Sequence, residues 1–261
     1  MKHFPYIAIF VLVLATLACG VPSASPEATV TPLSTDTLMP TDTLVPTDTS
    51  TPSPTATLNA HATAAVKGTK AAGDALDQLD ALLGDTDIPY KSGHLLWQQT
   101  RSLDIQLSGP DNKILNIDKD LTAENFIFKS DVKWEASGIL LCGAIFRSEP
   151  NLEKGKQYQF IYLRLSGLPA WAVEVHEFGR FKNSPTQTKF SDALDLSNGS
   201  TNTFVLVVQD DNFTIYINNV RQGKYYDYSK QRSEGTFGVF ASQDSGKGNC
   251  EYKNSWVWAL E

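Results

Sequence analysis

Apolar and polar side chains alternate along several segments of the second half of the chain. In FIFKSDVKW, residues 126–134, the even positions are mostly apolar, and the odd positions after Ile127 are charged. Because successive side chains of a strand point to opposite faces, this pattern predicts a half-buried strand with its Phe, Val and Trp side chains inward. Similar or continuously apolar runs predict further strands at residues 139–146, 158–165, 171–178, 204–208, 213–217, 236–241 and 251–260.

Turn-forming residues separate these segments. Asp210-Asp211-Asn212 and Asn218-Asn219 both lie between predicted strands, and Asn and Asp tolerate the positive φ angles that tight turns require. No amphipathic helix of useful length appears after Gly84. Many short strands separated by turns predict an all-β domain over residues 88–261, in which two antiparallel sheets pack as a sandwich.

A helical pattern precedes this domain. Leu76, Leu79 and Leu83 fall at i, i+3 and i+7, which predicts a helix from about Ala71 that ends at Gly84. We expect residues 58–87 to form a helical connector.

Residues 19–57 have a different composition, rich in Thr, Pro, Ser, Ala and Asp. The sequence TDTLMP at residues 35–40 recurs as TDTLVP at residues 41–46. This segment has too little apolar surface to offset the entropy of ordering, so it is expected to be a disordered stalk.

The first residues show the pattern of an export signal. An apolar run from Ile7 to Leu17 follows Lys2 and is shorter than the roughly 20 residues that span a bilayer. The sequence ATLAC at residues 15–19 resembles a bacterial lipobox. The resemblance implies a signal peptide over residues 1–18, a lipid on the Cys19 thiol, and a membrane-anchored, extracytoplasmic lipoprotein at the bacterial cell surface. The alternative is an ordinary secretory signal that is cut nearby.

Four motifs in the predicted β domain occur in a recognisable order. They are GAIFR at residues 143–147, FTIYINNV at 213–220, GTFGVF at 235–240 and NSWVW at 254–258. The set resembles LamG-like and concanavalin A-like jelly rolls over about residues 92–261, with Asn219 where the family prefers Gly. The resemblance implies a jelly roll with one concave sheet, which holds sugars in lectin, carbohydrate-binding and glycosidase members.

The segment WAVEVHEF at residues 171–178 offers polar groups for a ligand. Glu174 and His176 share one face of the predicted strand, whereas Glu177 points to the other face unless a bulge intervenes. Some glycosidases of this fold carry E-x-D-x-E on such a strand, and the middle Asp is missing here. Retaining hydrolysis needs two carboxyl groups about 5 Å apart. We therefore expect Glu174 and His176 to bind hydroxyls, with no catalytic residue assigned.

Aromatic side chains are the second candidate for ligand contact. Trp171, Tyr225 and Tyr226 are expected to stack on sugar rings, although filling the core is the more common use of such residues. Calcium bound by Asp210, Asp211 and Asp244 is an alternative to a simple role in turns. No other cofactor is expected.

Cysteine use and charge complete the sequence-based expectations. Cys142 and Cys250 are expected to pair as a disulfide in an oxidising compartment, with two buried free thiols as the alternative. The net charge is −7, and no Lys/Arg run is present, which argues against nucleic acid as a partner.

These observations favour a surface lipoprotein that binds an extracellular ligand, most simply a glycan, without catalysis. The alternatives are a glycoside hydrolase of the same fold and a structural or protein-interaction module of the cell envelope. Paired carboxylates would favour the first alternative, and a filled concave face would favour the second.

Overall fold

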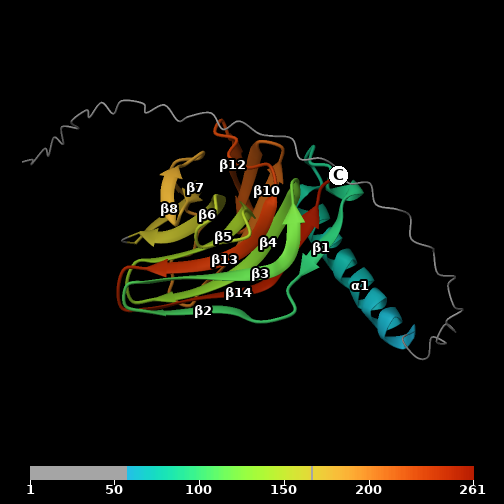
Figure 1. Cartoon of the computed structure of the whole chain (residues 1–261), viewed down its shortest axis with the longest axis horizontal. Coiled ribbons are helices and arrows are strands. Elements are labelled where there is room, and N and C mark those ends of the chain that lie inside the picture. The colour runs from blue at the N-terminus through green and yellow to red at the C-terminus, as the bar shows by residue number, and fades with distance from the viewer. Residues whose placement is uncertain (1–57, 166) are drawn as a thin grey trace, which may run out of the picture. The chain divides into compact units, whose positions relative to one another are not determined.

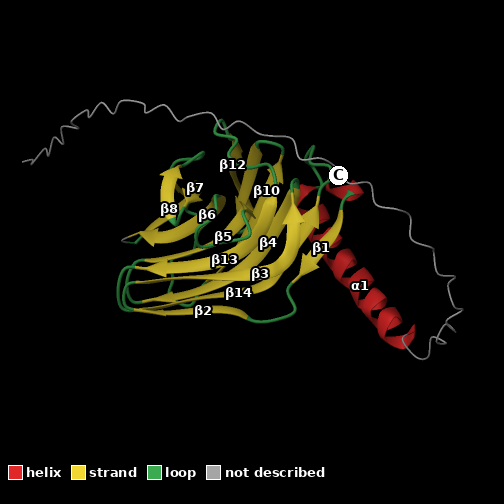
Figure 2. Cartoon of the chain, viewed as in Figure 1, coloured by secondary structure: helices red, strands yellow, loops and turns green. Residues whose placement is uncertain are grey.

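The computed structural model describes residues 58–165 and 167–261 of the 261-residue chain. The described residues belong to one compact unit. The expected signal peptide, Cys19 and the expected stalk lie outside the described residues, so those expectations remain predictions. Strands make up most of the unit (Figures 1 and 2).

Two antiparallel sheets form the unit. Sheet A has the order β1 (His94–Gln98), β14 (Lys247–Ala259), β4 (Phe126–Ala136), β10 (Thr201–Gln209), β11 (Asn212–Ile217) and β12 (Val220–Tyr226), with β2 (Leu103–Ser108) also paired to β14. Sheet B has the order β3 (Asp111–Ala123), β13 (Gly235–Gln243), β5 (Leu140–Ser148), β6 (Gln157–Leu165), β7 (Leu168–Glu177) and β8 (Arg180–Asn183), with β9 (Lys189–Phe190) also paired to β7. The predicted all-β jelly-roll sandwich is confirmed.

The core lies between the inner faces of the two sheets. On β4, Phe126, Phe128 and Trp134 are buried in it, as the alternation predicts. From β6, Tyr158 and Phe160 enter the same cluster. The eight predicted strands are all present, with ends that differ by a few residues.

The predicted turns adopt the backbone conformation that their residues favour. Asp210 has φ 51° in the turn from β10 to β11, and Asn218 and Asn219 have φ 48° and 64° in the turn from β11 to β12. The Asn218 side chain donates a hydrogen bond to the Ala193 carbonyl at 2.7 Å. Asn at position 219 therefore fits its turn, although Gly is preferred there in the LamG-like motif that this segment resembles.

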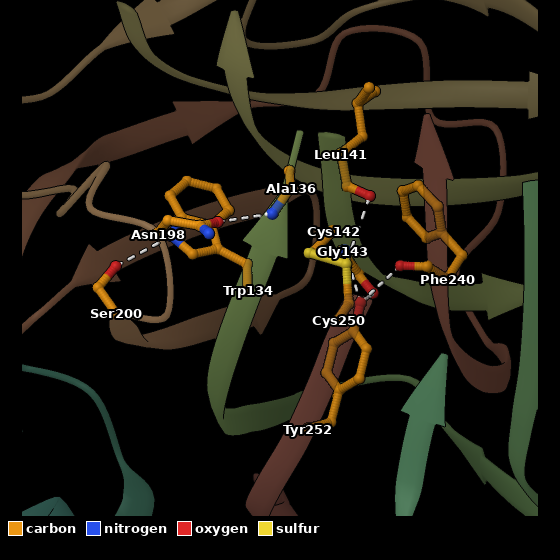
Figure 3. The surroundings of a disulfide bond; sticks show 10 residues. All are labelled: Trp134, Ala136, Leu141, Cys142, Gly143, Asn198, Ser200, Phe240, Cys250 and Tyr252. Carbon is orange, nitrogen blue, oxygen red and sulfur yellow. Dashed lines mark hydrogen bonds between the residues drawn. A yellow bond between two sulfur atoms is a disulfide. The ribbon is translucent and has the colours of Figure 1, made fainter. Parts of the chain in front are cut away.

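A disulfide joins the two sheets inside the core. Cys142 on β5 of sheet B bonds to Cys250 on β14 of sheet A, and their Cα atoms lie 5.9 Å apart. Figure 3 shows Tyr252 beside this bond, where its hydroxyl accepts from the Gly143 N–H at 2.8 Å and donates to the Phe240 carbonyl at 2.5 Å. The predicted pairing of the two cysteines is confirmed, and it crosslinks the halves of the sandwich.

Helix α1 (Leu58–Leu83) covers an apolar patch on the outer face of sheet A. It begins earlier than the expected Ala71 and ends before Gly84, as expected. Its buried side chains, Ala75, Leu79 and Leu83, join a cluster that is separate from the core between the sheets. The sheet contributes Ile127, Val205, Val207, Tyr216, Trp256 and Trp258 to this cluster. The second half of the segment expected as a connector is thus packed against the sandwich.

Arg147, the last residue of the GAIFR motif, is buried at one end of the sandwich. Its guanidinium donates to the carbonyls of Glu124, at 2.7 Å, and Asp210, at 2.8 Å. Burial lowers the pKa of Arg147, and nearby Tyr158 and acidic groups partly oppose that effect. The arginine of this motif therefore holds the loops that follow β3 and β10.

Candidate functional site

The two outer faces of the sandwich differ in how much surface they leave open. On sheet A, α1 covers the apolar patch and leaves two hollows beside it, of ≈ 350 and ≈ 420 Å³. On sheet B, a groove of ≈ 730 Å³ lies open to solvent. A groove of that size is typical of a small-ligand site.

Apolar side chains form the floor of this groove. Ile145, Ile161 and Phe240 form a buried cluster on the outer face of sheet B, together with Leu152 from the loop that follows β5. Gly143 allows the Phe240 ring to lie close over β5, because a Cβ at position 143 would come within 2.5 Å of that ring. The floor is therefore partly filled and does not form a deep hole.

Polar side chains from neighbouring strands line the groove above this floor. Glu174 and His176 lie two residues apart on β7, and Gln159 and Gln157 of β6 are their register partners. The full lining is Asn112, Lys113, Ile114, Leu115, Leu141, Glu153, Gln157, Gln159, Ile161, Glu174, His176, Gly179, Phe240 and Ser242. The structure thus brings Glu174 and His176 together in one groove, with the buried side chains of Gln157 and Gln159 beneath them.

Glu174 and His176 contact each other directly. The His176 Nε2 atom lies 2.8 Å from the Glu174 Oε2 atom, and both side chains are half-buried. This contact fixes both side chains in place and leaves the second carboxylate oxygen of Glu174 for a ligand. A carboxylate held in this way can accept hydrogen bonds from hydroxyls.

Glu177 does not form a carboxylate pair with Glu174 in the groove. It is not part of the groove lining, and its carboxylate lies 3.1 Å from Lys182 Nζ and 3.8 Å from Lys156 Nζ. The other glutamate in the lining is Glu153, an exposed residue in the loop between β5 and β6. A hydrolase requires two positioned carboxyl groups, and Glu177 does not supply the second one.

The aromatic residues expected to stack on sugars lie elsewhere. Trp171 is 1% exposed and packs in the core between the sheets, where its ring meets Tyr225 edge-on at 5.6 Å, so the expectation for Trp171 is corrected. Burial raises the pKa of Tyr225, which packs against the same core. Tyr226 is exposed on β12 of sheet A, outside the groove lining. The physical reason is alternation: Trp171 shares the inward face of β7 with Val173 and Val175.

Two other exposed aromatic residues belong to the hairpin of β7 and β8, which adjoins the groove at His176 and Gly179, and the sequence did not single them out. Phe181 of β8 is 56% exposed, is the register partner of His176, and lies edge-on to the His176 ring at 6.2 Å. Phe178, in the turn between β7 and β8, is 72% exposed. Phe181 belongs to a four-residue edge strand that gives no clear signal of alternation. The proximity of Phe181 to His176 could therefore be found only from the structure.

The aspartates considered for calcium serve the local structure. Asp244 accepts a hydrogen bond from the Ile139 N–H at 2.9 Å, and Asp211 pairs with Lys230 at 2.6 Å. Asp210 donates its N–H to Asn125 at 2.7 Å. Within residues 58–165 and 167–261, no group of three or more His, Cys, Asp or Glu side chains is placed to hold a metal ion.

Comparison with known proteins gives matches of fold only. No protein-family model matches the chain, and no curated protein matches it by sequence. In the part of the chain that is described, no helix is long and apolar enough to cross a membrane.

Among solved structures, the chain is similar to the carbohydrate-binding module CBM66 from Bacillus subtilis, at 14% identity and a TM-score of 0.46, over 62% of this chain and 93% of that one. It is similar to a Bacillus licheniformis β-glucanase at 9% identity and a TM-score of 0.42, over 61% and 79%. It is also similar to the GH16 protein of a Bacteroides ovatus mixed-linkage glucan locus at 12% identity and a TM-score of 0.41, over 64% and 84%. At these values the similarities do not identify a ligand or an activity.

Proposed function

We propose that this chain binds a glycan, without cleaving it, in the groove on the outer face of sheet B. The observation that carries the proposal is the groove itself, in which the half-buried Glu174 and His176 side chains lie beside apolar side chains such as Ile161 and Phe240. Sugars present ring C–H groups on one side and hydroxyls on their edges. A surface that combines apolar area with a few fixed hydrogen-bonding groups suits such a ligand.

The proposal of binding without cleavage rests on the carboxylates. Glu174 is paired with His176, and Glu177 is paired with Lys182 and Lys156 outside the groove lining. A glycoside hydrolase of the same fold is the alternative, and it would require a second carboxylate at a fixed distance from Glu174. Release of product sugars by the protein would overturn the non-catalytic proposal.

Replacing the two polar groups of β7 is expected to weaken glycan binding. In Glu174→Ala/His176→Ala protein, the loss of the His176 ring and of the Glu174 carboxylate, whose hydrogen bonds are worth about 1.5–3 kcal/mol, should reduce affinity at least tenfold. The measurement is calorimetric titration of residues 58–261 with a panel of oligosaccharides and polysaccharides, with reducing sugars assayed in the same samples.

Glu135→Gln is the matched control for this variant. Glu135 pairs with Lys133 at 2.7 Å on β4 of sheet A, far from the groove lining, so its replacement should leave affinity unchanged. If the double variant binds glycan as tightly as the wild-type protein, the groove is not the site. If wild-type protein binds no glycan in the panel, the glycan proposal fails, and an envelope interaction module takes its place.

The proposed location is the bacterial cell surface, with a lipid on Cys19 as the membrane anchor. The support is the lipobox-like sequence at residues 15–19 behind a short apolar run. We expect the full-length chain expressed in a bacterial host to partition with membranes and to carry a diacylglyceryl mass on its N-terminal peptide. Cys19→Ser protein should lose both properties. A soluble wild-type chain with an unmodified Cys19 would rule out the anchor.

A further inference from the structure

The turn between β7 and β8 places a large aromatic residue where the backbone disfavours it. Phe178 and Gly179 both have positive φ angles, 52° and 68°, the combination that a two-residue hairpin turn of type I′ requires. Asn is the residue preferred at the first of these positions, and a bulky side chain there is unusual. Because the Phe178 ring is 72% exposed, core packing does not account for it. Strained residues of this kind cluster at functional sites.

The same turn is continuous with the groove. Gly179 is part of the groove lining, and Phe181, two residues further on, lies against His176. Phe181 therefore adjoins the β7 end of the groove through His176, and Phe178 is the exposed aromatic residue next to Gly179 in the same hairpin. The opposite end is lined by Asn112 and Ser242, from β3 and β13.

The hairpin is held in position by the neighbouring loop. The Phe178 N–H donates to the Lys154 carbonyl at 2.9 Å, and that loop is closed by a hydrogen bond from Gly155 N–H to the Asn151 carbonyl at 2.6 Å. Asn151 Oδ1 also accepts the N–H groups of Glu153 and Lys154, each at 3.1 Å. A hairpin backbone fixed in this way loses little entropy when a ligand binds to its side chains.

From this arrangement we infer that the groove takes an extended glycan chain, which continues beyond His176 and stacks on Phe181 and Phe178. The inference rests on the proposed glycan-binding function and adds to it the size of the ligand and the residues that recognise it. A groove that crosses the five neighbouring strands β3, β13, β5, β6 and β7 spans four strand spacings of about 4.7–4.9 Å each. A monosaccharide would fill only part of that length.

Phe178→Asn separates a role in binding from a role in folding. Asn suits the turn better than Phe, so the variant should unfold at the same temperature as the wild-type protein or at a higher one. Its affinity for a long oligosaccharide should nevertheless fall by about two- to tenfold, the range expected for loss of one aromatic contact. A residue with a merely structural role would not show this combination of effects.

The test titrates wild-type, Phe178→Asn and Phe181→Ala proteins with β-glucan, xylan, mannan and fructan oligosaccharides from disaccharide to hexasaccharide. In the wild-type protein, affinity should rise with chain length, and each variant should lose that rise while keeping the affinity for the disaccharide. Tyr228→Ala is the control, since Tyr228 is 88% exposed but follows β12 of sheet A, whereas Phe178 and Phe181 belong to the β7–β8 hairpin of sheet B, and it should behave as the wild-type protein does.

The outcomes distinguish this inference from the proposed function. If the wild-type protein binds a glycan but affinity does not depend on chain length, or if both Phe variants bind the hexasaccharide normally, the inference is wrong and the proposed function stands. If the wild-type protein binds none of these glycans, both are wrong. If the Phe variants instead lose binding to phosphatidylglycerol vesicles, the hairpin contacts lipid, and the inference is again wrong.

Discussion

A chain that begins at Ile88, without helix α1, is expected to be less stable than the chain that retains it by about 5 kcal/mol or more. Leu79 and Leu83 are almost fully buried against sheet A, and each contributes about 1.5–3 kcal/mol by burial. Removal of α1 also exposes Trp256 and Trp258, which lie beneath it. Domains are stable by only about 5–15 kcal/mol, so a loss of this size can prevent folding at ambient temperature.

Thermal unfolding of residues 58–261 and 88–261 measures this effect. At about 2–4 °C per kcal/mol for a domain of this size, the unfolding midpoint should fall by about 10–20 °C. Leu79→Ala should lower the free energy of unfolding by about 2–5 kcal/mol, whereas Asp77→Ala on the exposed side of α1 should change it little. Equal midpoints for the long and short chains would show that α1 is only a connector.

Removing the disulfide between Cys142 and Cys250 is expected to cost about 4–5 kcal/mol. The two cysteines are 108 residues apart, and the entropic model gives about that value for a closed loop of this length. Both cysteines are fully buried, so the small alanine side chains of Cys142→Ala/Cys250→Ala would leave additional unfilled volume in the core.

Urea unfolding of the Cys142→Ala/Cys250→Ala protein, beside the wild-type protein with and without reductant, tests this prediction. The wild-type midpoint should shift down on reduction, and the double variant should be insensitive to reductant. If the double variant matches the oxidised wild-type protein in stability, the bond between the sheets contributes nothing to the fold.

The alternation on β4 shows what the sequence could reveal about the fold. The even positions from Phe126 to Trp134 enter the core as predicted, and Lys129, Asp131 and Lys133 lie on the other face. Ile127 lies on the same outward face but is apolar, because α1 covers that position. An apolar residue on an otherwise charged face therefore indicated a covered patch. The sequence alone could not show that α1 is the element that covers Ile127.

The strands that the sequence pattern did not predict were missed for a common physical reason. β3 carries five charged side chains among thirteen residues, and β12 begins with Val220 followed by Arg221 and Gln222. Edge strands such as β8 and β12 have one open side and bury little, so their sequences are not constrained to alternate. Central strands, in contrast, are fixed by burial and were found from the apolar pattern.

The sequence predicted residues of the site only where alternation along a strand decides which face of the sheet a side chain occupies. Glu174 and His176 share an outward parity, and the structure places both in the groove. Trp171 has the inward parity of Val173, so alternation alone could have excluded it as a stacking residue. Phe181 could not be selected, because its contact with His176 depends on the pairing of β8 with β7 and on the register shift between them.

The docking of α1 determines how the unit responds to a mechanical pull. A force applied at the N-terminal end of α1 acts first on the contacts of Ala75, Leu79 and Leu83 with sheet A. Side-chain contacts of this kind can break one after another along the helix. The Cys142–Cys250 crosslink, in contrast, resists any force that separates the two sheets. Under load, α1 should detach as an extensible element while the groove on sheet B keeps its shape.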